Sequence, residues 1–221
     1  MMGTTAGWQR AARIMRRAAW GVPGAAVDRA AANVEAWLDD ALTYGDDPGV
    51  RATPPPTFGA LPEVTATSTR EQKQARKDAM RQQGEQLLTW WLTRMLSAQR
   101  PVVERLTFGW HQHWATSLTK VRSAPLMLGQ NELLRRSALG SVTDLTRSMV
   151  MDPALMIWLD AEKNTKAAPN ENLARELMEL FTLGVGGGYT ETDVKQSARA
   201  LSGWRVADDG TVSRDPKRSD P

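Results

Sequence analysis

The sequence predicts an all-α protein: an irregular multi-helix bundle with a proline-rich loop and at most a short terminal β-hairpin. Three observations lead to this prediction. Apolar residues recur at helical spacing along most of the chain, residues that start and stop helices recur between these stretches, and strand-like alternation occurs only near Trp204. A chain of 221 residues is long enough to bury a core of its own.

Residues 1–44 are predicted to form helices that pack on the body. Trp8, Ala12 and Met15 recur at helical spacing, which indicates a short amphipathic helix, and a second helix is expected over 25–42. The arginine pair of the first helix resembles a twin-arginine signal, but no apolar stretch follows it. We therefore predict no signal peptide and, by default, a cytoplasmic location.

The composition changes between residues 45 and 69, where five of the 12 prolines lie among Gly and Thr. Such a stretch sustains neither a helix nor a central strand, so we predict a linker or a long surface loop with polyproline character. A proline-rich ligand for a partner is the alternative, and a spacer is favoured over it.

Residues 70–205 are predicted to form the main helical domain. Pro101 suits the first turn of a helix, and Pro153 is expected to break one. The expected helices cover residues 70–98, 101–120, 124–139, 141–159, 171–183 and 191–202.

The last two of these helices carry clear boundary residues. Asn170 can cap the helix that Gly184 ends, and Thr190 with Asp193 forms a capping-box pattern before the helix that Gly203 ends. A short hairpin is expected across residues 204–206 and 211–213. The polar segment 206–221 has no helical or strand period, and we predict a flexible tail there.

Composition excludes several kinds of chemistry. With no cysteine there are no disulfides, thiolate metal sites or thiol catalysis, and any imidazole chemistry must use His111 or His113. A net charge of +3 is small, and the basic stretch 70–81 also contains acidic residues, so nucleic-acid binding is disfavoured. No apolar run approaches the roughly 20 residues that span a bilayer, so no membrane span is predicted.

Three segments, with two short motifs after them, carry a family resemblance. They are Trp90–Leu96, Glu104–Ser117 and Pro169–Val185, followed by Tyr189-Thr190-Glu191 and Ser202-Gly203-Trp204. On these the chain resembles the DUF1800 family of uncharacterised bacterial proteins, from about residue 11 to residue 206. The resemblance implies a mostly helical fold and no established activity.

Two further expectations follow from the resemblance. Family members are usually much longer, so it implies a truncated or N-terminal portion. Relatives are often encoded beside a second uncharacterised family that carries export signals, which implies a protein partner.

The two histidines are the first candidates for chemistry. Residues two apart on a helix point in nearly opposite directions, so His111 and His113 do not chelate one ion together. His113 falls near the apolar stripe and is predicted to be a hydrogen-bonded core imidazole. His111 shares a stripe with Glu104 and Thr107, which makes half of a metal or acid–base site. A structural role for His111 is the favoured alternative.

Carboxylates on the helix after Asn170 are the second group of candidates. Asn172, Glu176 and Glu179 form one polar stripe, and Glu176 lies at its border with the core, where a carboxylate needs a partner. We take Glu176, His111 and Glu179 as candidate catalytic residues, and Glu176, His111 and Glu104 as candidate ligands of a divalent metal. No Glu-x-x-His motif supports that metal site.

Other residues are candidates for binding, each with a structural alternative. Trp110 and Trp114, near Trp90 and Trp91, are predicted to line a groove for sugar rings or a peptide, although packing in the core is favoured. Asn170, Asn172 and Arg175 follow a polar loop and are predicted to shape the mouth of a pocket. Glu171, Arg175 and Glu179 also form a four-spaced ladder, which is typical of simple ion pairs.

Two functions follow from these patterns. The preferred one is a helical scaffold or interaction module that acts with a protein partner and is held together by buried polar networks. The alternative is a metal-assisted or general acid–base hydrolase that uses the Glu and His candidates. Whether the protein is an enzyme stays open on sequence alone.

Overall fold

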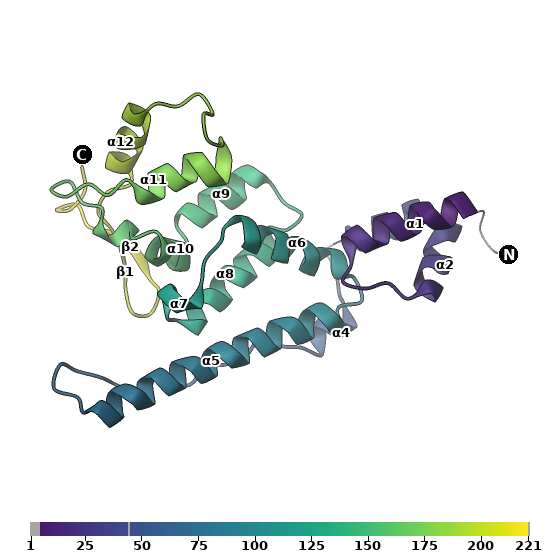
Figure 1. The fold of residues 1–221 in the computed structure, drawn as a ribbon, viewed down its shortest axis with the longest axis horizontal. Coiled ribbons are helices and arrows are strands. Elements are labelled where there is room, and N and C mark those ends of the chain that lie inside the picture. Colours follow the sequence, from purple (N-terminus) through teal and green to yellow (C-terminus); the bar gives the residue numbers. More distant parts are fainter. Residues whose placement is uncertain (1–4, 44, 221) are drawn as a thin grey trace.

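The computed structural model describes residues 5–43 and 45–220 (Figure 1). Within these ranges it is built of helices and one two-stranded antiparallel sheet, which confirms the predicted fold class. The parts of the predicted N-terminal segment and tail that fall on residues 1–4, Tyr44 and Pro221 lie outside the described residues. No helix in the described ranges is both long and apolar enough to cross a membrane.

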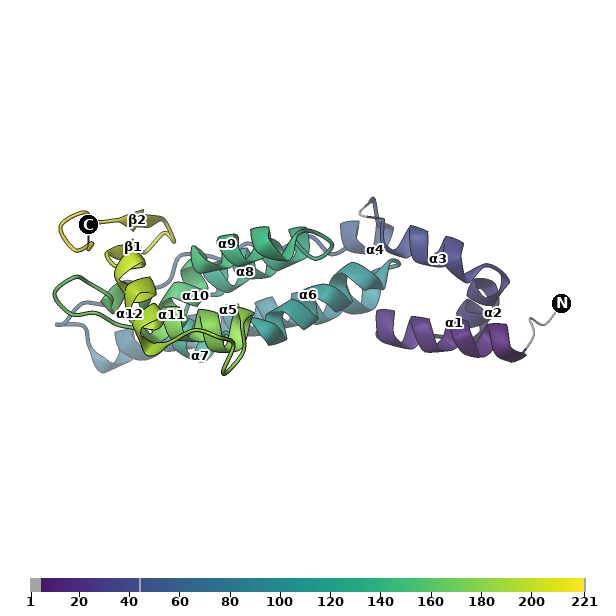
Figure 2. The ribbon, with the colours of Figure 1, turned by 90° about the horizontal axis from the view of Figure 1, so that it is seen from above.

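Three helices form the N-terminal end of the elongated molecule (Figures 1 and 2). They are α1 (Thr5–Ala18), α2 (Gly24–Ala32) and α3 (Val34–Ala41). The single helix predicted over 25–42 is wrong, because the Asn33 side chain accepts a hydrogen bond from the Ala36 amide and caps a new helix. Met15, Val27 and Val34 bury a small core here.

A proline-rich stretch and one long helix come next. Asp47 caps α4 (Pro48–Arg51), and a capping box at Thr69 opens α5 (Arg70–Ser97). Between them the chain runs along α5, tied to it where Arg76 Nη1 donates to the Pro62 carbonyl at 2.8 Å and Gln83 Nε2 to the Gly59 carbonyl at 2.7 Å. The proline-rich stretch is therefore fastened to the first half of α5.

The middle of the chain packs against the second half of α5. Its helices are α6 (Pro101–His113), α7 (Leu118–Val121), α8 (Ala124–Arg136), α9 (Val142–Val150) and α10 (Pro153–Trp158). The helix predicted over 101–120 is in fact two, because the Ser117 side chain caps α7. The predicted break at Pro153 is confirmed, and the side chain of Asp152 caps α10 there.

The predicted helix over 171–183 changes its winding along its length. After the short helix η1 (Ala161–Lys163), α11 (Asn172–Glu176) continues into η2 (Leu177–Thr182), which is a π-helix. Asn170 accepts a hydrogen bond from the Asn172 amide at 3.0 Å, and Gly184 has a positive φ of 82°, so both predicted boundary residues act. The capping box at Thr190 opens α12 (Glu191–Ala200), as predicted.

The C-terminal segment forms more structure than its sequence pattern indicates. Strand β1 (Trp204–Val206) pairs antiparallel with β2 (Val212–Arg214), one residue later than expected. The segment predicted to be a flexible tail is tied to the body: the Lys166 amide donates to the Arg218 carbonyl at 2.8 Å, and Arg199 pairs with Asp220 at 2.6 Å. These contacts lie far apart in sequence, so local periodicity does not reveal them.

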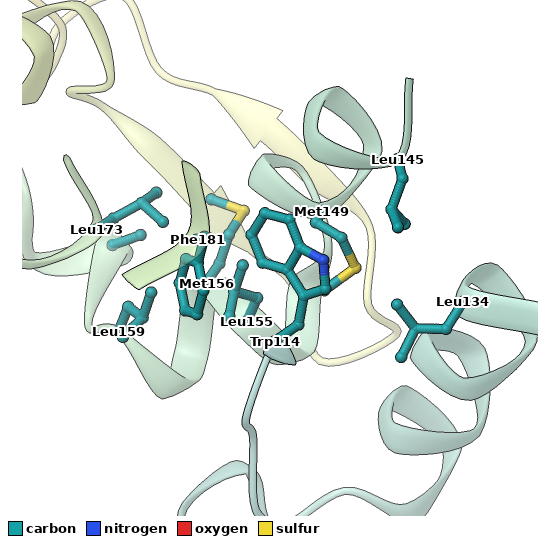
Figure 3. Close-up of a cluster of buried hydrophobic side chains, with 10 residues drawn as sticks. Trp114, Leu134, Leu145, Met149, Leu155, Met156, Leu159, Leu173 and Phe181 are labelled. Atoms are coloured by element: carbon teal, nitrogen blue, oxygen red, sulfur yellow. The ribbon is translucent and has the colours of Figure 1, made fainter. Parts of the chain in front are cut away.

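The main core lies among α8, α9, α10, α11 and η2 (Figure 3). Trp114, which follows α6, is 1% exposed and packs against Phe181 of η2 with ring centroids 4.5 Å apart. Leu134, Met149 and Leu155 are fully buried beside them. This core fixes α6 and α8, which carry Glu104, His111, Asn131 and Arg135.

Candidate functional site

Glu104 lies in the interior, where two arginines bind it. Its side chain is 2% exposed and receives Arg94 Nε at 2.8 Å and Arg135 Nε at 2.7 Å. Burial acts to raise the pKa of Glu104, but the hydrogen bonds and charges of Arg135 and Arg94 outweigh it and hold the pKa below its ordinary value. The carboxylate is thus ionised and fully engaged in a structural ion network.

The carboxylates of α11 and η2 surround Arg175. Its guanidinium reaches Glu171 at 3.0 Å, Glu179 at 3.3 Å and, from α12, Glu191 at 2.8 Å. This confirms the four-spaced ladder and adds a fourth member that sequence spacing did not show. Glu176 is half-buried, and its side chain makes no hydrogen bond or ion pair with another described residue.

The structure does not bring the three predicted metal ligands together. Glu104 faces Arg94 and Arg135, His111 faces Trp91, and Glu176 is on another helix. Across residues 5–43 and 45–220, no three His, Asp or Glu side chains are grouped closely enough to hold a metal ion. The structure thus places the proposed ligands in three separate surroundings.

The two histidines have different surroundings, as predicted. His113 is at the surface rather than in the core, and its Nε2 donates to the Phe181 carbonyl at 3.0 Å. His111 packs edge-on against Trp91, with ring centroids 5.1 Å apart. Burial lowers the pKa of His111, so its imidazole is neutral at pH 7.

Three of the four clustered tryptophans belong to the interior. Trp114 is in the main core and Trp110 packs against it. Trp90 is buried beside Arg94 and Arg135, and its indole N–H donates to the Thr53 carbonyl at 3.0 Å. Only Trp91 lines a groove, so the favoured interpretation, packing in the core, holds for the other three.

The asparagines before and at the start of α11 hold backbone in place. Asn172 Nδ2 donates to the Leu159 carbonyl at 3.0 Å, and the Asn170 amide donates to Asn164 Oδ1 at 3.0 Å. Asn164 in turn donates to the Ala198 carbonyl at 2.7 Å. These bonds connect the loop to α10 and α12 and use the polar groups that we expected at the mouth of a pocket.

A groove of about 460 Å³ opens between α5, α6, α7 and α8. Such a volume is within the range of ligand sites, and the walls are mainly apolar. The apolar residues are Leu87, Leu88, Trp91, Leu118 and Met127, and the uncharged polar ones are His111, Thr116, Ser117 and Asn131. The buried Thr116 and Asn131 mark the inner part of the groove. Sequence reasoning identified His111 but missed Asn131, because its neighbours in the groove come from distant helices.

Exposed leucines continue this apolar surface along α5. Leu88, Leu92 and Leu96 are 56%, 48% and 80% exposed, and we call them the leucine row. Their spacing of four puts them on one face of the helix. The signal was present in the sequence, since residues 87–96 of α5 contain more apolar side chains than one helix face can bury.

The fold and this surface define a class: an all-α bundle with an ion network inside and an open apolar groove. The chain belongs to the family described as "Protein of unknown function (DUF1800)", whose model matches residues 13–221. This confirms the family resemblance seen in its motifs. Neither a curated protein nor a solved structure matches the chain.

Proposed function

We propose that this protein is an interaction module that binds an amphipathic helix of a protein partner along α5. The observation that carries the proposal is the leucine row beside the apolar groove. Three large apolar side chains in line on one helix are the pattern by which helices recognise each other through i and i+4 anchors.

The energetics favour a partner on this surface. Burying a fully exposed leucine side chain stabilises a complex by about 1.5–3 kcal/mol, and a half-exposed one by roughly half of that, before the costs of association are counted. The row extends about 12 Å along α5, at 1.5 Å per residue, which matches just over two turns of a bound helix. A partner helix lying there covers the row and the outer edge of the groove together.

The buried ion network supports this surface by fixing α5. Arg94 of α5 binds Glu104 of α6, and Arg135 of α8 binds the same carboxylate. The second half of α5 is therefore held against two other helices before any partner arrives. A preformed surface loses less conformational entropy on binding than a mobile one.

The hydrolase alternative stays a prediction. It relied on Glu104, His111, Glu176 and Glu179 acting together. Glu104 is instead neutralised by two arginines, and Glu179 is paired with Arg175. Of these four residues, that leaves His111 and Glu176 without an ion-pair partner among the described residues, and the mechanism needs more than two.

Selection from a displayed library of helical peptides tests the proposal. We expect enriched peptides to carry apolar residues at i, i+3 or i+4, and i+7, and to bind Leu92→Glu at least about tenfold more weakly than wild type, a loss of ~1.4 kcal/mol. Leu183→Glu is the matched control, because Leu183 is 56% exposed but lies after η2. Enriched peptides without this pattern, or ones that Leu92→Glu binds equally well, would contradict the proposal.

A further inference from the structure

The groove contains a buried carboxamide that no described residue satisfies. Asn131 of α8 is 5% exposed, and its Oδ1 is buried without a hydrogen-bond partner among those residues. The indole N–H of Trp91 on α5, which also lines the groove, is buried and unpartnered there, as are those of Trp20, Trp110 and Trp114 away from it. Leaving such groups unpaired costs about 1–3 kcal/mol each, and Asn131 and Trp91 are distinguished by lining one and the same groove.

The neighbouring residue of α8, Gln130, also has a buried carboxamide, and both of its polar atoms are hydrogen-bonded. Gln130 is 1% exposed, accepts from Thr116 Oγ1 at 2.5 Å and donates through Nε2 to Asp152 Oδ1 at 2.6 Å. Of two adjacent carboxamides on one helix, one is therefore hydrogen-bonded and the other is not. The satisfied one faces the interior, and the unsatisfied one lines the groove.

The groove favours a polar group without charge. His111 is neutral at pH 7, and the ionic residues among those lining the groove, Arg81 and Glu85, pair with each other at 3.2 Å. A carboxylate or an ammonium would enter this apolar space without a counter-charge and would lose its hydration. A group that both donates and accepts hydrogen bonds, yet carries no charge, avoids that cost.

We infer that the inner part of the groove binds an uncharged amide group at the end of an apolar chain, the side chain of a glutamine or asparagine on the partner helix. Asn131 Oδ1 accepts from the amide N–H of the ligand, and Trp91 Nε1 donates to its carbonyl oxygen. The apolar stem lies against Leu118 and Met127. This inference rests on the proposed function and adds the chemistry of one anchor residue.

The test uses three probes of nearly equal size: pentanamide, pentanoate and pentylammonium. Each is titrated into the full chain while the indole N–H signals of the nine tryptophans are followed by NMR, with Trp91 assigned through Trp91→Phe. We expect pentanamide to shift the Trp91 signal in a saturable way, and each charged probe to need at least about tenfold more for the same shift.

Two variants make the test specific. Asn131→Leu should abolish the response to pentanamide without lowering stability, because it removes an unsatisfied polar group. Gln112→Leu, on the exposed side of α6, is the matched control and should respond as wild type does. An unchanged Trp91 signal, an equal response to the charged probes, or a retained response in Asn131→Leu would overturn the inference.

The experiments separate this inference from the proposed function. Leu92 does not line the groove, so Leu92→Glu should lose helical peptides and keep the pentanamide response. A pentanamide response without any helical peptide that depends on Leu92 would reject the partner helix as the source of the amide. Binding of helical peptides without a pentanamide response would reject the amide site alone.

Discussion

Arg135 holds Glu104 through two parallel hydrogen bonds, Nε to Oε1 at 2.7 Å and Nη2 to Oε2 at 2.9 Å. Arg94 adds a third bond to Oε1 at 2.8 Å. The fork geometry of a guanidinium matches a carboxylate closely, which makes such pairs strong and directional. One buried carboxylate in this way joins α5, α6 and α8.

Replacing Glu104 by Gln should destabilise the protein by about 3–5 kcal/mol, because the buried Arg94 loses its counter-charge and the buried Arg135 keeps only Glu132, 2.7 Å away. Urea unfolding monitored by circular dichroism measures this loss. Glu85→Gln removes an exposed pair with Arg81 and should cost less than about 1 kcal/mol. A similar, small effect of both substitutions would show that the network contributes little.

Asp152 should make stability depend on pH. Burial raises its pKa to about 6, against hydrogen bonds from Leu155 and Gln130 that lower it. The folded state thus binds this proton more tightly than the unfolded state, whose pKa is about 3.8. The stabilisation is complete below pH 3.8 and is lost as the pH rises through about 6.

The size of this effect follows from the two pKa values. The gap between 3.8 and about 6 corresponds to ~3 kcal/mol at most. Urea unfolding of wild type and Asp152→Asn from pH 4 to pH 7 isolates the contribution, since other groups titrate in both proteins. The wild type should lose stability relative to the variant over this range, and a constant difference would contradict the assignment.

The leucine row should contribute little to the stability of the free protein. Leu92 is 48% exposed and Leu134 is 0% exposed, so the same change to Ala has different consequences at the two sites. We expect Leu134→Ala to cost about 2–5 kcal/mol and Leu92→Ala less than about 0.5 kcal/mol. Thermal and urea unfolding give both values. A large loss for Leu92→Ala would mean that the row belongs to the fold.

Gly203 should not tolerate a side chain. Its φ is 84°, and a Cβ there would collide with Ser219 and lie 2.9 Å from the Asp215 carbonyl oxygen. Gly203→Ala should therefore loosen the segment after β2 and speed its proteolysis. Gly129→Ala, in α8 with open space around it, should instead stabilise the protein by about 0.5–1 kcal/mol. Equal protease resistance of Gly203→Ala and wild type would contradict this.

Local patterns predicted much of the fold. Pro153, Gly184 and the Thr190–Asp193 capping box set helix boundaries through contacts within a few residues, and the structure confirms all three. Asn33 acts in the same local way, yet it lies inside an apolar helical period that masked its capping role. Sequence reading finds such caps only when a break in periodicity accompanies them.

The buried ion network and the groove depend on contacts that local patterns do not contain. Glu104 pairs with Arg94 and Arg135, which are 10 and 31 residues away in the sequence. Because these partners come from α5 and α8, the spacing within α6 predicted a metal ligand where the structure has an ion pair. Asn131 carries no motif of its own, and its importance comes from lacking a partner. The spacing of His111 and Glu104 on one face was predicted from the sequence, but the residues opposite that face were not.

The winding of η2 makes residues 177–182 unusually tolerant of a one-residue deletion. A π-helix contains one more residue than the α-helical turn it replaces, so a single deletion there would restore ordinary winding. The same deletion in an α-helix would rotate every later residue by about 100° around the axis. After loss of the exposed Leu180, Phe181 would therefore keep its place against Trp114, and its carbonyl would stay near His113. Loss of one codon here would do less damage than the same loss in a neighbouring α-helix.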